Sequence, residues 1–253
     1  MFDLGREHIV SKSMFLRRRA TQAEYFDSPD RSLAETAESY KSLARINRLF
    51  HFAEPFQRFL PRLLGAENCP AVKLLDLGAG DGSLGQTLQT WAAKRGWSWD
   101  ITNLDLSPHA SELCKTGKFV CGSVLDLPFE NESFDVVIAN QMTHHLSSGD
   151  EVAQHFREAH RVARRVVLLS DMHRSIILYG VIWAALRAGN FPKRFREDGL
   201  LSVKRGFRSD DWRELARRAG LGDAKVWMHY GARVMLAAQK IPAPQPQVLQ
   251  AQI

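Results

Sequence analysis

The stretch LLDLGAGDGSLG at residues 74–85 decides the fold. An apolar run, typical of a buried parallel strand, leads into Asp76. Three glycines follow at alternate positions: Gly78, Gly80 and Gly82. A chain that leaves a strand in a sharp turn needs positive φ angles and close backbone approach, and glycine allows both. Amides at the start of the next helix would then face a nucleotide-like ligand at the carboxyl edge of the sheet. The stretch predicts a strand, a ligand-binding loop and a helix.

Acidic residues recur at the ends of the strands expected next. The run 99–104 reads as a second strand that ends in Asp105, a little over twenty residues beyond the glycines, as in a βαβ unit. A carboxylate there can accept hydrogen bonds from both hydroxyls of a ribose. Residues 119–129 read as a third strand with an acidic end, and 134–140 as a fourth. For any one acidic residue, a helix cap or a turn is the alternative role. The ordered series of strand ends favours a ligand.

These residues resemble the class I S-adenosylmethionine (SAM) dependent methyltransferases, whose first motif is an acidic residue followed by GxGxG. The dinucleotide-binding form would need a further glycine at Ser83. The resemblance covers roughly residues 70–170. It implies an α/β, Rossmann-like fold with a seven-stranded, mostly parallel sheet, helices on both faces and one antiparallel strand. It also implies SAM as the methyl donor and S-adenosyl-L-homocysteine as the product.

The resemblance assigns roles to individual residues. By position, Asp126 at the end of the third expected strand would accept a hydrogen bond from the adenine amino group, and Asp105 would bind the ribose. The residues expected to bind the cofactor are Asp76, Gly78, Ala79, Gly80, Gly82, Asp105, Leu106, Asp126, Leu127 and Asn140.

Helical segments are expected before this core. Residues 1–30 have many charges and weak periodicity, which predicts a partly ordered arm. An apolar stripe over residues 33–50 predicts an amphipathic helix, and residues 55–64 predict a second helix. These helices either cover the ligand site or only pack against it. We expect an N-terminal cap over residues 1–65 and a SAM-binding domain over residues 66–240.

An insertion is expected after the fifth strand, at about residues 172–208. Its apolar run 176–186 is too short to cross a membrane, which takes ~20 residues. Because the run is apolar almost all round, we expect it to be buried as a lid over the acceptor, with a core helix or a dimer face as the alternative. Residues 190–207 look irregular, and Ser209 is expected to cap the next helix.

The chain is expected to end with two strands, at 224–229 and 233–239, and a disordered tail over residues 241–253. In the resembled family such a hairpin closes the sheet and carries the antiparallel strand.

Histidines follow the fourth and fifth expected strands, where the acceptor of the methyl group would lie. An oxygen or carbon acceptor can need a base near neutral pH, and histidine is the usual one. We therefore predict His145, His173 and His144 as catalytic candidates, with packing or capping as the alternative for each. Arg174 could instead pair with an acidic group of the substrate.

Composition limits the function further. The 253 residues, 45% of them apolar, can bury one sizeable core. The net charge of +6 comes from dispersed basic residues, so we expect no nucleic-acid partner. The three cysteines have no metal-like spacing, and we expect no metal. Without a secretory pattern at the N-terminus, the expected location is cytoplasmic, with at most peripheral membrane contact.

The whole chain is similar to bacterial small-molecule methyltransferases of the ubiquinone/menaquinone-biosynthesis type. Their Asp-x-His-Arg stretch after strand five is present at residues 171–174, whereas Ala163-Arg164-Arg165 replaces their Pro-Gly-Gly turn. The similarity implies methylation of an oxygen or carbon on a small aromatic, quinone or polyketide-like acceptor. A methyltransferase of RNA or protein would instead show an open basic groove. A non-catalytic SAM-binding protein is the remaining alternative, because glycines indicate binding rather than turnover.

Overall fold

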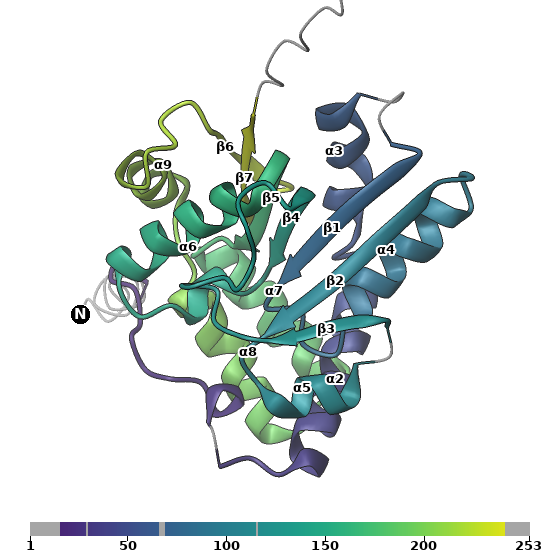
Figure 1. Cartoon of the computed structure of the whole chain (residues 1–253). Coiled ribbons are helices and arrows are strands. Elements are labelled where there is room, and N and C mark those ends of the chain that lie inside the picture. Colours follow the sequence, from purple (N-terminus) through teal and green to yellow (C-terminus); the bar gives the residue numbers. More distant parts are fainter. Residues whose placement is uncertain (1–15, 29, 66–68, 115, 241–253) are drawn as a thin grey trace, which may run out of the picture.

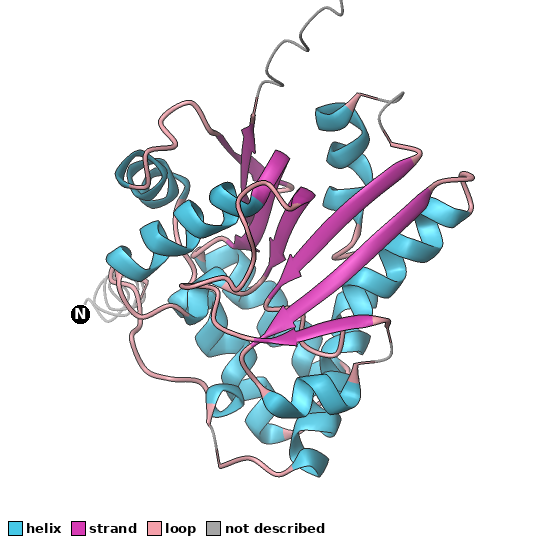
Figure 2. Ribbon diagram, in the orientation of Figure 1, coloured by secondary structure: helices cyan, strands magenta, loops and turns pink. Residues whose placement is uncertain are grey.

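A central sheet of seven strands organises the molecule (Figure 1; Figure 2). The structure is a computed structural model, and it describes residues 16–28, 30–65, 69–114 and 116–240. The spatial strand order is β3-β2-β1-β4-β5-β7-β6, and β7 runs antiparallel to both of its neighbours while the other pairs are parallel. This confirms the predicted fold. The strands are β1 (Ala71–Leu77), β2 (Ser98–Asp105), β3 (Lys118–Cys121), β4 (Phe134–Asn140), β5 (Ala163–Met172), β6 (Lys225–His229) and β7 (Arg233–Gln239).

Helices cover both faces of the sheet and its carboxyl edge. The α-helices are α2 (Leu33–Leu49), α3 (Glu54–Leu64), α4 (Ser83–Ala93), α5 (Pro108–Leu113), α6 (Gly149–Val162), α7 (Ile176–Ala188), α8 (Lys193–Arg205) and α9 (Ser209–Arg218). Two short 3₁₀ helices, η1 (Tyr25–Asp27) and η3 (Thr143–His145), lie near that edge. Helices α3 and α4 lie on one face and α6 and α9 on the other, while α2, α5, α7 and α8 gather where β1 and β2 end (Figure 1).

The sheet is apolar on both faces because helices bury both of them. Neighbouring residues of a strand point to opposite faces. Thus Leu74 of β1 packs in one core with Phe56 of α3, whereas Leu75 packs in a second core with Phe156 of α6 and Trp212 of α9. All five side chains are fully buried. The two cores fix the positions of the strand ends, on which the site is built.

A third apolar cluster joins the helices at the carboxyl edge. It includes Ile46 of α2, Ile182 and Leu186 of α7, and Val203 of α8. The two helices predicted before β1 are therefore confirmed, and α2 packs against the insertion that follows β5.

Helix α7 is buried on its inner face only. Leu178, Ile182 and Leu186 face the third cluster, but Ile177 is 77% exposed and Trp183 is 48% exposed. Within the described residues this apolar run is therefore buried on one face only. Residues three or four positions apart share one face of a helix, so the inner stripe is satisfied while the outer side chains remain in solvent.

Two further local predictions need correction. Residues 190–207 were expected to be irregular, but most of them form α8. Gly199 weakens the helical propensity, and contacts made by distant residues stabilise the helix instead: the Asp198 carboxylate accepts hydrogen bonds from the amides of Tyr25 and Phe26. Ser209 was expected to cap α9, but it is the first residue of that helix, and the N-cap is Arg208. The Arg208 amide donates a hydrogen bond to the carboxylate of Asp211.

The described part of the N-terminal arm packs firmly on the fold. The Arg19 guanidinium donates hydrogen bonds to the carbonyls of His144, Leu146 and Arg205. Residues 16–28 of the predicted partly ordered arm are therefore held in place by the rest of the fold. The first fifteen residues of the arm and the predicted disordered tail lie outside the described residues. No helix in the described part of the chain is long and apolar enough to cross a membrane.

His155 predicts a specific pH dependence of stability. This side chain on α6 is fully buried, and burial lowers its pKa from 6.5 to about 4. Between these values the unfolded chain binds a proton that the folded chain does not. Because the unfolded state then binds more protons, the free energy of unfolding falls as the pH falls from 6.5 to 4, by roughly 3 kcal/mol in all. Urea titrations at several pH values should show a loss of that size in wild type that is missing from His155→Gln. If the free energy of unfolding depends on pH in the same way in both proteins, the lowered pKa of His155 is not the cause of the loss.

Candidate functional site

A cavity of about 740 Å³ lies at the carboxyl ends of β1, β2 and β4. Residues that follow these strands line its floor, and residues of the N-terminal segment, α2, α7 and α8 line its cover. Most of the predicted site residues meet here: Asp76, Gly78, Ala79, Asp105, Leu106, Asn140, His144 and His145. Gly80, Gly82, Asp126, Leu127 and His173 do not line this cavity.

The glycine loop has the conformation that its sequence predicts. Gly78 has a φ of +66°, and a Cβ atom added to it would overlap the side chain of Met142. Gly80 supports the loop from outside the cavity, because its amide donates a 2.9 Å hydrogen bond to Oδ2 of Asp105. The loop and the end of β2 therefore hold each other in place.

Buried oxygen atoms without partners face this part of the cavity. Oδ2 of Asp76 and Oδ1 of Asn140 have no hydrogen-bond partner within the described residues. Burial, and then the negative charge of Asp105, raise the pKa of Asp76 to about 8. A cationic or hydroxyl-bearing ligand would satisfy both oxygens and lower the cost of burying the carboxylate. SAM, with its ammonium group and ribose hydroxyls, fits this set of acceptors.

Asp105 lies at the end of β2, as predicted. Its Oδ1 accepts a 2.9 Å hydrogen bond from the amide of Ser107, and Oδ2 accepts the bond from Gly80. Burial raises the pKa of Asp105 although these hydrogen bonds oppose the shift. Each carboxylate oxygen has capacity for a second hydrogen bond, so the ribose role stays open to it.

We expect Asp105→Ala to weaken SAM binding by about 1.5–3 kcal/mol, which is roughly a 10- to 160-fold loss of affinity. The reason is the loss of hydrogen bonds between a charged carboxylate and the ribose. Isothermal titration calorimetry with SAM measures this directly. Asp100→Ala is a matched control, because Asp100 lies on the same strand but pairs with Lys118 far from the strand end. If Asp105→Ala binds SAM as tightly as this control, the ribose role is wrong.

The predicted adenine contact does not lie where it was expected. Strand β3 ends at Cys121 and does not continue to residue 129, so Asp126 lies in the following loop, where it is exposed. Leu127 packs in the core, and its amide donates to the Glu158 carboxylate. Ser123, Val124 and Leu125 line the cavity instead. The adenine contact was assigned to Asp126 because the third strand was predicted to extend to residue 129, eight residues beyond its end at Cys121.

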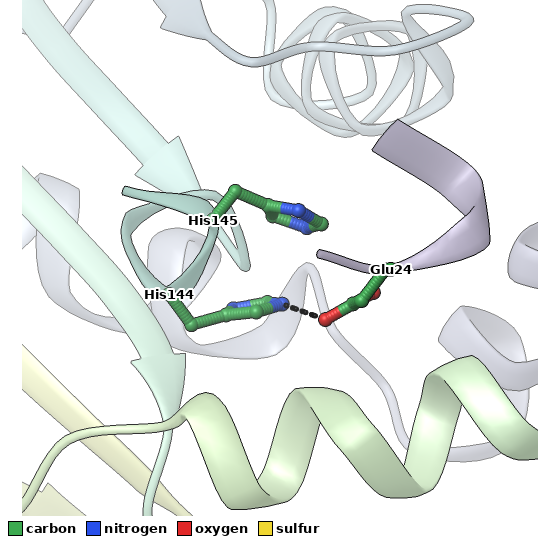
Figure 3. A group of neighbouring side chains, drawn as sticks. All are labelled: Glu24, His144 and His145. Atoms are coloured by element: carbon green, nitrogen blue, oxygen red, sulfur yellow. Dashed lines mark ion pairs between the residues drawn. The ribbon is translucent and has the colours of Figure 1, made fainter. Parts of the chain in front are cut away.

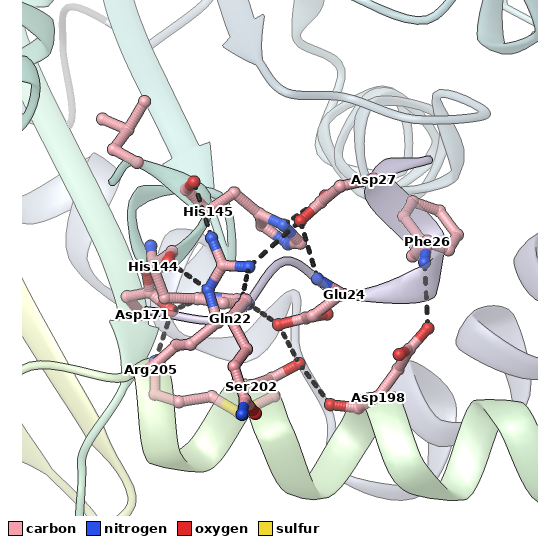
Figure 4. Close-up of polar contacts among 12 residues, drawn as sticks. Gln22, Glu24, Phe26, Asp27, His144, His145, Asp171, Asp198, Ser202 and Arg205 are labelled. Atoms are coloured by element: carbon pink, nitrogen blue, oxygen red, sulfur yellow. Dashed lines mark hydrogen bonds and ion pairs between the residues drawn. The ribbon is translucent and has the colours of Figure 1, made fainter. Parts of the chain in front are cut away.

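His144 lines the cavity and pairs with Asp171, which is fully buried (Figure 4). The Asp171 carboxylate accepts from Nδ1 of His144 at 2.7 Å and from the His144 amide, also at 2.7 Å. Burial alone would raise the pKa of Asp171, but the nearby His144 and the hydrogen bonds that the carboxylate accepts hold its pKa below the usual range. An ionised Asp171 keeps the proton on Nδ1, which leaves the Nε2 lone pair of His144 free.

The second histidine faces the N-terminal segment. Nδ1 of His145 lies 2.6 Å from Oδ1 of Asp27, and the two imidazole rings are in contact, with centroids 4.2 Å apart. Glu24 is buried nearby, and burial raises its pKa to about 7. Its Oε1 accepts from the hydroxyl of Ser202 on α8. The acidic residues of this segment thus converge on both histidines.

Arg205 of α8 holds the two histidines and the N-terminal segment in place. Its guanidinium donates to the carbonyls of His144, His145 and Gln22 and contacts Asp27 at 3.2 Å (Figure 4). One buried cation therefore ties η3, α8 and the N-terminal segment together. All three nitrogens of the Arg205 guanidinium donate hydrogen bonds to these groups, so the backbone of the two histidines has little freedom to move.

Two predicted side chains do not contribute to the cavity. Met172 lines it, but His173 does not, because neighbouring residues of an extended chain point in opposite directions. The backbone of His173 forms an isolated, parallel β-bridge with Phe207. Arg174 is buried and donates to the carbonyls of Leu16, Arg17 and Gly206, so it has a structural role and does not reach a substrate in this cavity. The catalytic prediction for His173 is therefore not supported by its position.

Sequence reasoning missed the cover of the site. Tyr40 of α2 packs so close to the glycine loop that a Cβ on Gly80 would lie 2.8 Å from its ring. In the sequence Tyr40 is one member of an apolar helical stripe, and Glu24, Asp27 and Arg205 stand among many other charges. No local signal distinguishes them, because they reach the site only through contacts between distant segments.

Comparison with known proteins identifies the domain. A family model described as "Methyltransferase domain" matches residues 75–169, which run from the end of β1 through the glycine loop to most of β5. No curated protein matches the chain.

Solved structures share the fold at low sequence identity. The plantazolicin methyltransferase BpumL in complex with SAH has a TM-score of 0.64 at 13% identity, covering 94% of this chain and 100% of that one. A putative SAM-dependent methyltransferase of Methanococcus maripaludis has a TM-score of 0.59 at 17% identity, covering 88% and 98%. A possible histamine N-methyltransferase of Thermotoga maritima has a TM-score of 0.53 at 17% identity, covering 81% and 99%. The family match thus shows a methyltransferase domain over residues 75–169, and the strand order, the glycine loop and these structures show that the chain has the fold of class I SAM-dependent methyltransferases.

Proposed function

We propose that this methyltransferase methylates an oxygen or an acidic carbon of a small, largely apolar acceptor. One observation carries the proposal: the cavity that begins at the glycine loop continues past His144 into an apolar space beneath the cover. Donor and acceptor can therefore occupy neighbouring parts of one cavity, which is what direct methyl transfer requires.

The apolar part of the cavity indicates the kind of acceptor. Its lining comes from three helices and the turn after α2, and it includes Ile46, Phe52, Ile182, Leu186 and Phe195. Small-molecule sites are typically lined by apolar and aromatic side chains with a few polar groups that fix orientation. An aromatic, quinone or polyketide-like ring fits this description.

The N-terminal segment argues against a large acceptor. Residues 21–28 line the cavity together with α7 and α8, so the apolar part lies under a cover and not in an open groove. RNA or protein would need that cover removed. The plantazolicin methyltransferase, which has the same fold, was crystallised with a monoazolic desmethylPZN analog, and this supports a small organic acceptor.

SAM supplies a methyl group activated for displacement by its sulfonium. The chain has to position the acceptor, exclude water and remove the proton of the attacking atom. His144 is the side chain best placed for the last task, because Asp171 holds its Nδ1 proton and its Nε2 has no hydrogen-bond partner in the described part of the chain. The lone pair on Nε2 can take a proton from a hydroxyl or from an acidic carbon.

A screen of acceptors tests this proposal. The full chain is incubated with SAM and a panel of phenols, quinols and polyketide-like phenols, with a short RNA and a mixture of peptides as macromolecular alternatives. We expect at least one small acceptor to gain the mass of one methylene group, and RNA and peptides to remain unchanged. Methylation of RNA or peptides alone would overturn the proposal.

A further inference from the structure

Three ligand-type side chains converge at the polar end of the cavity. Glu24 and the two histidines of η3 each offer one donor atom, and these atoms all lie within 4.8 Å of one another (Figure 3). All three residues line the cavity. Oε1 of Glu24 lies 3.6 Å from Nε2 of His144. Donors on one Zn²⁺ lie roughly 3–3.5 Å apart, given bonds of about 2.0–2.2 Å, so this pair already has nearly the separation that an ion needs.

The surroundings of His144 suit a metal ligand. Its side chain is 2% exposed, and the buried Nε2 has no hydrogen-bond partner among the described residues. Nδ1 donates to Asp171, which fixes the tautomer with the lone pair on Nε2. A carboxylate that accepts from the far nitrogen of a ligating histidine is the usual outer support of a metal site, because it orients the ring and raises its basicity.

His145 also has a carboxylate beside its ring. The Asp27 carboxylate lies 2.6 Å from Nδ1 of His145, and Arg205 holds Asp27 in turn at 3.2 Å. The site would thus have two imidazoles and one buried carboxylate as ligands, with a further carboxylate behind each ring. A cation placed between Glu24 and the rings would also compensate the negative charge that Glu24 brings into the interior.

We propose that Glu24, His144 and His145 bind a divalent first-row transition-metal ion that coordinates and acidifies the hydroxyl of the acceptor. Two imidazoles and a carboxylate suit Zn²⁺, Fe²⁺, Co²⁺ or Ni²⁺ better than Mg²⁺ or Ca²⁺, which prefer oxygen ligands. Three protein ligands leave a position for the substrate on the side of the cavity.

The catalytic part of this inference rests on the proposed function, and the binding part does not. With the ion in place, the Nε2 lone pair of His144 holds the metal, and the metal lowers the pKa of the hydroxyl, as zinc does for bound water. The hydroxyl proton leaves to solvent, the oxygen–carbon bond forms as the sulfur–carbon bond breaks, and the ion keeps its oxidation state. No oxidant or reductant is needed.

Metal binding is tested without turnover. The full chain is freed of metal with a chelator and titrated with Zn²⁺ by calorimetry, and with Co²⁺ by its visible absorption. We expect one ion per chain, an absorption typical of cobalt bound by nitrogen and oxygen in a low-symmetry site, and a higher melting temperature with the ion bound. Asp171→Asn should weaken binding about 10- to 100-fold through loss of the outer support. Glu24→Gln and His144→Gln should weaken it at least as much.

A partly exposed pair on α5, of which His109 also lines the cavity, provides the matched control. His109 and Glu112 lie 3.3 Å apart on α5 and are partly exposed, so they form a histidine–carboxylate pair without the buried setting. His109→Gln should leave the stoichiometry and affinity unchanged, and circular dichroism checks that each variant is folded. Stoichiometric binding that survives both Glu24→Gln and His144→Gln would overturn the proposed site, and so would the absence of stoichiometric binding in wild type.

Activity then separates the two proposals. If wild type binds no ion but methylates a small acceptor after chelation, the metal proposal fails and the proposed function stands. If the ion binds at these residues but only RNA or peptides are methylated, the metal site stands and the proposed function fails. If a small acceptor is methylated only with the ion restored, both stand.

Discussion

Replacement of His144 by glutamine is expected to lower kcat by about 10²–10⁴-fold, with little change in SAM affinity. The side chain lines the cavity, and its buried Nε2 has no hydrogen-bond partner among the described residues, which supports the proposed role of His144 as the base. His144 belongs neither to the glycine loop nor to the proposed ribose contact at Asp105, so donor binding should be spared. Steady-state kinetics with the acceptor found in the screen, and calorimetry with SAM, measure the two effects separately.

Two further variants test whether a loss of kcat in His144→Gln is due to the proposed role of His144. Asp171→Asn removes the charge that fixes the Nδ1 proton of His144, and kcat should fall here as well, although the imidazole is still present. His173→Gln is the matched control, because His173 lies beyond the end of the next strand but outside the cavity. It should retain nearly full kcat. If His173→Gln loses activity while His144→Gln keeps it, the histidines have been assigned the wrong way round.

Donor binding should also be sensitive to substitution of Gly78. Its φ is +66°, and a Cβ atom there would overlap Met142, so Gly78→Ala has to displace the loop that lines the cavity. A displacement of about 1 Å near a reacting centre can cost about 10²-fold. We expect Gly78→Ala to lower SAM affinity by roughly that factor in a binding titration.

Gly96 is the control for the backbone itself. It has a φ of +73°, close to that of Gly78, but a Cβ atom there meets nothing within 4 Å. Both alanine variants suffer the same left-handed strain, of order 1–2 kcal/mol, and only Gly78→Ala adds the overlap at the cavity. Gly96→Ala should bind SAM like wild type. If the two variants bind SAM equally, the loss comes from strain in general and not from the loop.

Much of the fold could be predicted because its signals are local. The strand, the glycines and the helix start lie within residues 74–85, and Asp105 follows at the distance that a crossover helix imposes. Such features depend on the backbone and on neighbouring residues alone. For the same reason the final hairpin of β6 and β7 was predicted almost to the residue.

The rest of the site depends on contacts between distant segments. Glu24 meets His144 only because Arg19 and Arg205 attach the N-terminal segment to η3 and α8. A residue-by-residue reading could not distinguish Glu24 from the other acidic residues of the arm. The same holds for α8, whose hydrogen bonds to residues 25 and 26 outweigh the weak propensity of its own sequence.

The positions of Asp126 and His173 show a different limit. Both were chosen because they follow expected strands, but the end of a strand and the direction of a side chain depend on single residues. Strand β3 stops at Cys121, several residues earlier than its apolar run suggested, and the extended chain turns His173 away from the cavity that Met172 lines.

The most direct test of the account is a crystal structure of the protein with S-adenosyl-L-homocysteine and an analogue of its acceptor. We expect the ribose at Asp105, the amino-acid end near Asp76 and Asn140, and the analogue's hydroxyl beside His144. That hydroxyl should lie about 2.6–3.2 Å from Nε2 of His144, or share an ion with it. An analogue bound outside the cavity, or a hydroxyl that faces away from His144 with no ion between them, would contradict the account.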